Sequence, residues 1–101
     1  MHPTVLRLPG KLMLDDAPAA LAALAQALRG EAGGATATVD ASGLLRFDSA
    51  ALAVLLECRR LAQAAGKGFA VHGSPAKLAA LARLYGLDAL LPLAAAPSAA
   101  R

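Results

Sequence analysis

The pattern that most constrains the fold of this chain is an alternation of short apolar runs with longer segments of helical period, all within 101 residues. The short runs are typical of strands and lie at residues 4–8, 36–40 and 69–72. Between and after them, leucine and alanine recur at the spacing of one helix face. Strands that alternate with helices through short loops predict an α/β domain in which helices flank a mixed β-sheet.

Three helices are predicted, and each has a recognisable beginning or end. The first covers residues 17–28, where Pro18 is tolerated in the opening turn. The second runs from about residue 49 to 65 and is stopped by Gly66 and Gly68. The third begins at Pro75 and carries a predicted core face. That face consists of Leu78, Leu81, Ala82 and Tyr85.

The two ends of the chain give further expectations. A fourth apolar run, at residues 11–14, follows the first after Pro9 and Gly10, a turn signal that suggests a hairpin-like opening. The alanine-rich end, residues 94–101, is expected to be a disordered tail. We therefore expect a single domain over residues 1–93.

The composition predicts a protein of the cytosol that does not insert directly into a membrane. The hydrophobic fraction is 57%, but most of the excess is alanine, and no apolar run approaches the length of a membrane span. The first residues, MHPTVLRLPGK, lack the pattern of a secretory signal. The single cysteine, Cys58, excludes an internal disulfide and fits a reducing compartment.

The charge pattern argues against a nucleic-acid partner. The formal net charge is +3, yet the basic residues are scattered, and only Arg59 and Arg60 are adjacent. Aromatic residues, which would stack on bases, make up 3% of the chain. A solvated surface explains these charges better than a nucleic-acid site does.

The segment FDSAALAVLLECRR, residues 47–60, predicts a helix with two apolar stripes. The predicted core face consists of Ala51, Val54, Leu55, Cys58, Leu61, Ala62 and Ala65. The opposite strip, which we expect to face solvent, consists of Ser49, Leu52, Leu56, Arg60 and Gln63. An apolar strip with a polar rim is typical of a contact surface. The sequence therefore favours a partner-binding role for this strip.

Enzymatic and metal-binding roles have little support in the sequence. Ser49 has no G-x-S-x-G context, and His72, at a strand end, makes no triad with it. The glycine-rich stretch GEAGGATA, residues 30–37, lacks the lysine of a phosphate-binding loop. Metal-ligand spacings are absent as well, so we expect no cofactor. Cys58, on the core face, is interpreted as an inert small hydrophobe.

The order of these motifs resembles the STAS domain family, which includes bacterial anti-sigma-factor antagonists. The resemblance spans about residues 5–91 and rests on a strand ending at Asp40, the pair Asp48–Ser49 and the apolar helix after it. It also rests on the ending LARLYGLDALL, which is similar to the MlaB-like subgroup, the cytoplasmic STAS subunits of Mla phospholipid ABC transporters. Leu84, Tyr85 and Leu87 carry this part of the match. The resemblance implies a sheet of about four or five strands flanked by helices, and a non-enzymatic role.

Two functions follow from the resemblance as expectations. In the first, the chain binds and stabilises or activates the MlaF-like ATPase of an Mla-type transporter that maintains outer-membrane lipid asymmetry, and so lies at the inner membrane on its cytoplasmic side. The partner-binding residues would then be Asp48, Ser49, Leu52, Leu56 and Arg60. In the alternative, the chain is an anti-sigma-factor antagonist that captures an anti-sigma kinase and is regulated by phosphorylation of Ser49.

The acid–hydroxyl pair also has purely structural interpretations. Ser49 is a candidate N-cap of the second helix, and we expect capping rather than phosphorylation there. Asp48 could cap the same helix or fix the preceding loop through backbone amides. Ala51 departs from the family pattern, in which many members have glycine two places after the hydroxyl residue.

Overall fold

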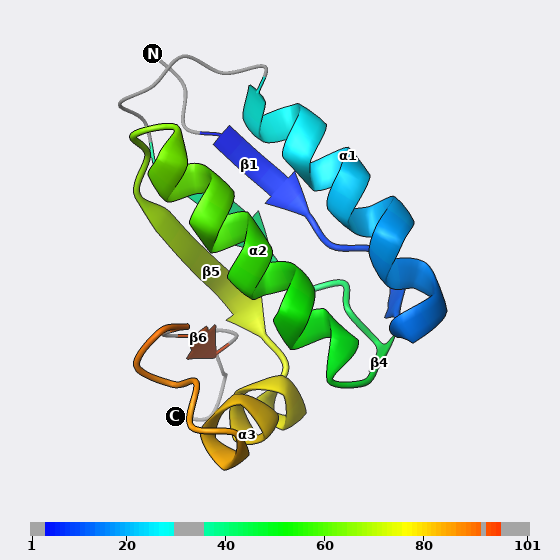
Figure 1. The fold of residues 1–101 in the computed structure, drawn as a ribbon. Helices are drawn as coiled ribbons and strands as arrows, with labels where there is room; N and C mark the ends of the chain where they lie inside the picture. The colour runs from blue at the N-terminus through cyan, green and yellow to red at the C-terminus, as the bar shows by residue number, and fades with distance from the viewer. Residues whose placement is uncertain (1–3, 30–35, 92, 96–101) are drawn as a thin grey trace.

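The computed structural model describes residues 4–29, 36–91 and 93–95 of the chain. Its elements follow the predicted alternation of strands and helices (Figure 1). In chain order they are β1 (Thr4–Arg7), β2 (Lys11–Leu12), the 3₁₀ helix η1 (Leu14–Asp16), α1 (Ala17–Arg29), β3 (Ala37–Asp40), β4 (Arg46–Phe47), α2 (Ala50–Ala64), β5 (Phe69–Ser74), α3 (Ala76–Leu84) and β6 (Leu93–Ala95). The predicted α/β class is confirmed, and each predicted helix is found within two residues of its expected bounds.

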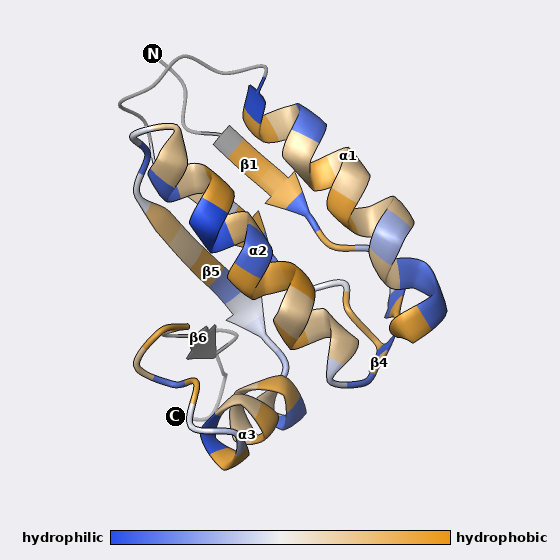
Figure 2. Cartoon of the chain, in the orientation of Figure 1, coloured by the Kyte–Doolittle hydropathy of each residue, from blue (hydrophilic) through white to orange (hydrophobic). Residues whose placement is uncertain are grey.

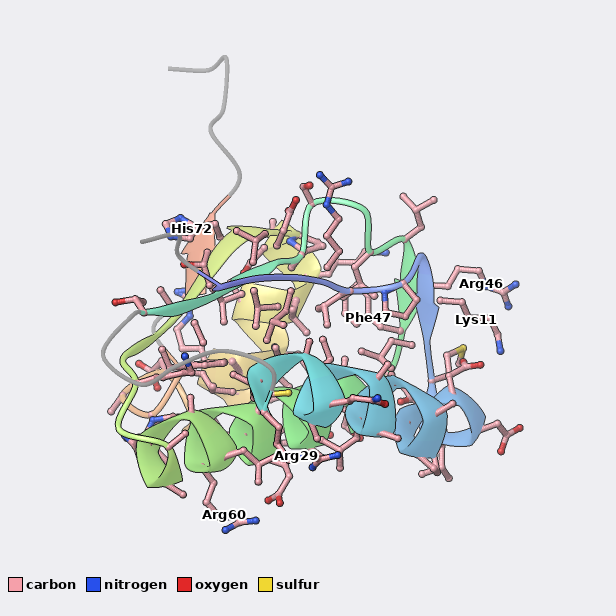
Figure 3. The ribbon with its side chains drawn as sticks, turned by 90° about the horizontal axis from the view of Figure 1, so that it is seen from above. Lys11, Arg29, Arg46, Phe47, Arg60 and His72 are labelled. Atoms are coloured by element: carbon pink, nitrogen blue, oxygen red, sulfur yellow. The ribbon has the colours of Figure 1, made fainter. Side chains whose placement is uncertain are left out.

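The main sheet has four strands in the order β1-β3-β5-β6. All of its pairings are parallel, where the sequence had suggested a mixture of directions. Leu6, Val39 and Val71 lie side by side across three strands and are buried. Helices α1 and α2 pack against each other and cover this face of the sheet (Figures 1 and 3). A parallel sheet needs such crossover helices, because the chain must return to the same edge before each new strand.

The hairpin-like opening predicted at residues 4–14 is wrong. Strand β2 does not fold back on β1 but pairs in parallel with β4, in a separate two-stranded sheet. The backbone explains the difference, because the Leu8 N–H donates to the Asp40 carbonyl and so continues along β3. The Gly10 carbonyl then accepts hydrogen bonds from the N–H groups of Leu45 and Arg46. The chain therefore crosses to the β3–β4 loop instead of reversing.

The core lies between the sheet and the two long helices. Its largest fully buried side chains include Leu12, Leu52, Leu55, Leu78 and Leu91, which come from widely separated elements. Figure 2 shows that α2 is apolar through its first half and carries its hydrophilic residues in its second half. Burial of apolar side chains from nearly every element is the main stabilising term for a domain of this size.

Three expectations at the ends of elements are corrected by the structure. Tyr85 is 55% exposed rather than part of the core, because α3 ends at Leu84. Ala65 is exposed, because α2 ends at Ala64 and the chain turns at Gly66. The predicted disordered tail begins too early, since β6 extends through Ala95 and pairs with β5. The rest of that tail, residues 96–101, lies outside the described residues.

Candidate functional site

Asp48 organises the start of α2. Its Oδ1 accepts a hydrogen bond from the Ala50 N–H at 2.8 Å, and its Oδ2 accepts one from the Leu14 N–H at 3.2 Å. The first bond satisfies an N–H group that a helix start leaves without an intrahelical partner. The second joins η1 to the start of α2 across 34 positions of sequence. Asp48 therefore acts both as a helix cap and as a tether between two segments, as one interpretation of the sequence proposed.

Ser49 stands at the N-cap position of α2, but its hydroxyl makes no capping hydrogen bond. Its backbone is already helical, with φ −62° and ψ −16°, so the side chain is not placed to reach the next N–H groups. The side chain is exposed. The prediction that the Ser49 hydroxyl caps the helix is wrong, and the hydroxyl is presented to solvent beside the Asp48 carboxylate.

The predicted solvent-facing strip of α2 is only partly correct. Ser49, Arg60 and Gln63 are exposed, and Leu56 is half-buried against the core. Leu52, however, is 1% exposed and belongs to the same buried cluster as Leu78 of α3. Neighbouring elements cover a larger part of the α2 surface than the sequence indicated. Leu52, which lies at the border of the two predicted stripes, is therefore buried. Leu52 is therefore a core residue and is not available for surface contact.

We define the α2 outer face as Ser49, Ala53, Leu56, Arg60 and Gln63. These residues follow one another at intervals of three or four and share one side of the helix. Ala53 is exposed and was not singled out from the sequence, because alanine carries no chemical signal of its own. The face therefore combines a hydroxyl, a small residue, one partly accessible leucine and polar groups.

Arg60 is engaged in an ion pair within α2. Its Nε and Nη2 donate to the two carboxylate oxygens of Glu57, at 2.9 and 2.5 Å. The hydrogen bond from Arg60 lowers the pKa of Glu57, and the same contact raises the pKa of Arg60. Because both groups are solvent-exposed, this pair adds little stability. It does fix the guanidinium along the helix surface, where a partner would meet a neutralised pair rather than a free cation.

Two exposed leucines lie in the segments around the start of α2. Leu14, in η1, is 71% exposed, and Leu45, in the loop before β4, is 82% exposed. The backbone of Leu14 is held against α2 by Asp48. Sequence reasoning assigned Leu14 to a strand and gave Leu45 no role, because a single leucine in a short apolar run cannot be told from a core residue.

The same end of the molecule carries a pair of cations. Lys11 and Arg46 occupy matching positions of the β2–β4 pair, and Figure 3 shows both side chains extending outward there. Lys11 forms an ion pair with Asp16 at 3.0 Å. The Asp16 carboxylate also accepts a bond from the Met13 N–H, and these contacts lower its pKa.

The loop between β3 and β4 is closed by Asp40 and Ser42. The Asp40 carboxylate accepts hydrogen bonds from the Ser42 hydroxyl at 2.6 Å and the Ser42 N–H at 2.9 Å. The hydroxyl contact, followed by the N–H contact, lowers the pKa of Asp40. Gly73 packs closely against this turn, since a Cβ added there would lie 2.9 Å from the Ser42 Cβ. The sequence indicated only that Ser42 lies in a break between two elements, and it gave no sign of the contacts that Ser42 makes with Asp40 and Gly73.

The remaining singled-out side chains lie away from the α2 outer face. Cys58 is fully buried, which confirms that it is a core residue, and burial raises the pKa of its thiol to about 11. His72 is exposed on the uncovered face of the sheet, beside Asp40 in the strand register. In the part of the chain that the structure describes, no group of three or more His, Cys, Asp or Glu side chains could hold a metal ion.

A second exposed apolar group lies at the end of α3 and in the segment after it. Leu84 is 76% exposed, Tyr85 55% and Leu90 44%. Leu87 is half-buried and packs against the core. Of the residues that carry the subgroup resemblance, Leu84 and Tyr85 are therefore surface residues.

The described residues thus form an α/β domain with a parallel sheet covered on one face by two helices and an acid–hydroxyl pair at the start of the second helix. The protein-family model described as "Mlab, STAS domain" matches residues 1–92, and the chain belongs to this STAS-domain family.

A solved structure shares the fold. It is described as the structure of an anti-sigma-factor antagonist (STAS) domain protein from Planctomyces limnophilus, with a TM-score of 0.76 and 15% sequence identity. The match covers 95% of this chain and 83% of that one. At this identity the likeness supports the fold alone. Comparison with curated proteins gave no match. Within residues 4–29, 36–91 and 93–95, no helix is both long and apolar enough to cross a membrane.

Proposed function

We propose that this chain is the STAS subunit of an Mla-type phospholipid ABC transporter, and that it binds and stabilises or activates the transporter's cytoplasmic ATPase. The observation that carries the proposal is the family match over residues 1–92, whose description names MlaB. The subunit would act from the cytoplasmic side, held at the inner membrane through the complex, in a system that maintains outer-membrane lipid asymmetry.

The surface best suited to the ATPase is the α2 outer face together with Leu14. Ser49 and Ala53 are exposed and small, so a partner helix or loop could approach the α2 backbone closely. Leu14 supplies accessible apolar area beside the helix start, and Leu56 adds part of its side chain. Apolar area with a polar rim is the usual composition of a protein–protein contact.

Such a subunit needs no chemistry of its own. A protein that binds one assembly or conformation of the ATPase shifts the population toward it by mass action. The free energy of transport would come from nucleotide hydrolysis at the ATPase. We therefore expect the purified chain alone to hydrolyse no nucleotide.

The contact is tested by co-purification of the chain with the ATPase subunit of an Mla-type transporter from the native host. Ala53→Arg should abolish association, because a long charged side chain would be forced into the contact. Ala27→Arg is the matched control, since Ala27 is an exposed residue of α1 and does not belong to the α2 outer face. If the Ala53 variant co-purified as well as the Ala27 variant, the assignment of this face would be wrong.

The alternative function is that of an anti-sigma-factor antagonist switched by phosphorylation. It is favoured by one observation, the exposed Ser49 hydroxyl that takes no part in capping. A phosphate there would stand beside the Asp48 carboxylate, which would repel it. Intact-mass measurement on protein from the native host separates the two functions. A substantial phosphorylated fraction at Ser49 would support the antagonist, whereas the transporter proposal predicts none.

A further inference from the structure

A hollow of about 270 Å³ lies beside the C-terminal half of α2, away from the helix start. Arg59 and Gln63 of α2 line one part of it, and Phe69 of β5 and Leu90 line another. The volume falls slightly below the range usual for pockets that enclose a whole drug-sized ligand. A hollow of this size suits a small molecule or a single anchoring side chain.

The polar lining has one sign of charge. Arg59 and Gln63 lie one helical turn apart, and among the described residues neither side chain makes a hydrogen bond or ion pair. Lys67, which is 3% exposed, is a second basic residue of the lining, but it already has an interaction of its own, so Arg59 is the cation that a ligand would meet. None of the described residues that line the hollow is acidic. The neighbouring Arg60 differs from Arg59, because it is already paired with Glu57.

The apolar lining restricts the anion further. Phe69 is half-buried and Leu90 is 44% exposed, so both offer carbon surface to a group that enters beside Arg59. A bare inorganic anion would leave this surface in contact with water. A carboxylate joined to a short apolar chain would suit both the basic and the apolar lining. Its carboxylate could bind Arg59, since guanidinium groups bind carboxylates through paired hydrogen bonds, and its chain could cover Phe69 and Leu90.

We propose that this hollow binds a carboxylate carried on an apolar chain, and that its occupant is an acidic side chain, flanked by an apolar residue, on the partner protein. The identity of that partner rests on the proposed function, whereas the chemistry of the hollow does not. The hollow would then add a charge-dependent contact at the end of α2 remote from Ser49, so that the partner is held at both ends of the helix.

The first test uses the isolated chain and hexanoate as the probe, followed through backbone amide resonances. Hexanoate should shift the amides of Gly68, Phe69 and Leu90, and the matched neutral probe, hexanol, should shift them much less. Arg59→Ala should weaken hexanoate binding about tenfold, as expected for the loss of a charge-assisted contact. Arg60→Ala, the adjacent matched variant, should leave it unchanged. Absence of shifts in the hollow, equal effects of the two variants, or inorganic phosphate binding as well as hexanoate would overturn the proposal.

The second test concerns the occupant and uses the ATPase complex. Arg59→Glu should weaken the complex by at least about tenfold, because two carboxylates would then face each other. Arg83→Glu makes the same charge change at an exposed position of α3 and should leave the affinity nearly unchanged. Equal affinities for the two variants would overturn the assignment of the occupant. A wild-type chain that binds hexanoate but no ATPase would contradict the proposed function while leaving the carboxylate site in place.

Discussion

The backbone N–H of Leu14 donates a hydrogen bond to the carboxylate of Asp48, which simultaneously caps α2 through Ala50. One side chain thus holds the η1 turn, with its exposed leucine, against the helix start that carries Ser49. This contact links the two segments of the proposed partner surface, because they cannot separate without losing the bond.

Asp48→Ala should lower the free energy of unfolding by about 1–2 kcal/mol, since it removes a helix cap and a second hydrogen bond. Urea denaturation measures the change. Asp15→Ala is the control, because the Asp15 side chain is exposed and accepts no hydrogen bond within the described residues. Equal losses in the two variants would show that the tether contributes nothing.

Leu52→Ala should cost about 2–5 kcal/mol, because the side chain is fully buried and its loss leaves a cavity. Leu45→Ala should change stability by less than about 0.5 kcal/mol, since that leucine is mostly exposed. Thermal or urea unfolding distinguishes them. A stable Leu52 variant would restore the interpretation of this residue as part of a surface strip.

Gly73→Ala should destabilise the domain by about 1–3 kcal/mol. Gly73 has a φ of +73°, and an added Cβ would meet Ser42 at 2.9 Å, so both the backbone and the contact oppose a side chain. Gly43→Ala is the matched variant, because a Cβ there meets nothing within 4 Å. Comparable unfolding midpoints for the two proteins would contradict the described packing.

Cys58 should resist alkylation by iodoacetamide in the native state at pH 8 and react fully after denaturation, because the buried thiol keeps its proton. Its pKa is raised in the folded state from 9.0 to about 11. Between these two values the unfolded chain loses the thiol proton while the folded chain retains it, so the Cys58 contribution to stability should fall as the pH rises. Cys58→Ala should remove this part of the pH dependence. Rapid native-state labelling would contradict the burial.

Strands β1, β3 and β5 and the three helices could be predicted from the sequence, because each has a clear hydrophobic period, whereas the short strands β4 and β6 could not. The pairing of β2 with β4 could not, since it depends on where Gly10 meets the β3–β4 loop, a long-range contact that leaves no local signal. Hydrophobic periodicity predicted only the α/β class, whereas the STAS resemblance also predicted a sheet of about four or five strands flanked by helices.

The candidate site was only partly predictable. The pair Asp48–Ser49 was found, but only Asp48 caps the helix, because Ser49 already has helical backbone angles and its hydroxyl makes no capping bond. Leu52 was misplaced because helix phase gives the centre of a buried face and not its width, which depends on how neighbouring elements cover the helix. The exposure of Leu14 and Leu45 and the hollow beside Arg59 depend on tertiary contacts, so no local sequence pattern could predict them.

The proposal that this chain is a regulatory subunit of a lipid-transporter ATPase can be tested by measuring the ATPase activity of the transporter complex reconstituted with and without it. Complexes with the wild-type chain should be more active or more stable than complexes without it. Complexes with Ala53→Arg should match those that lack the chain. Equal activity and equal stability in all three preparations would contradict the account.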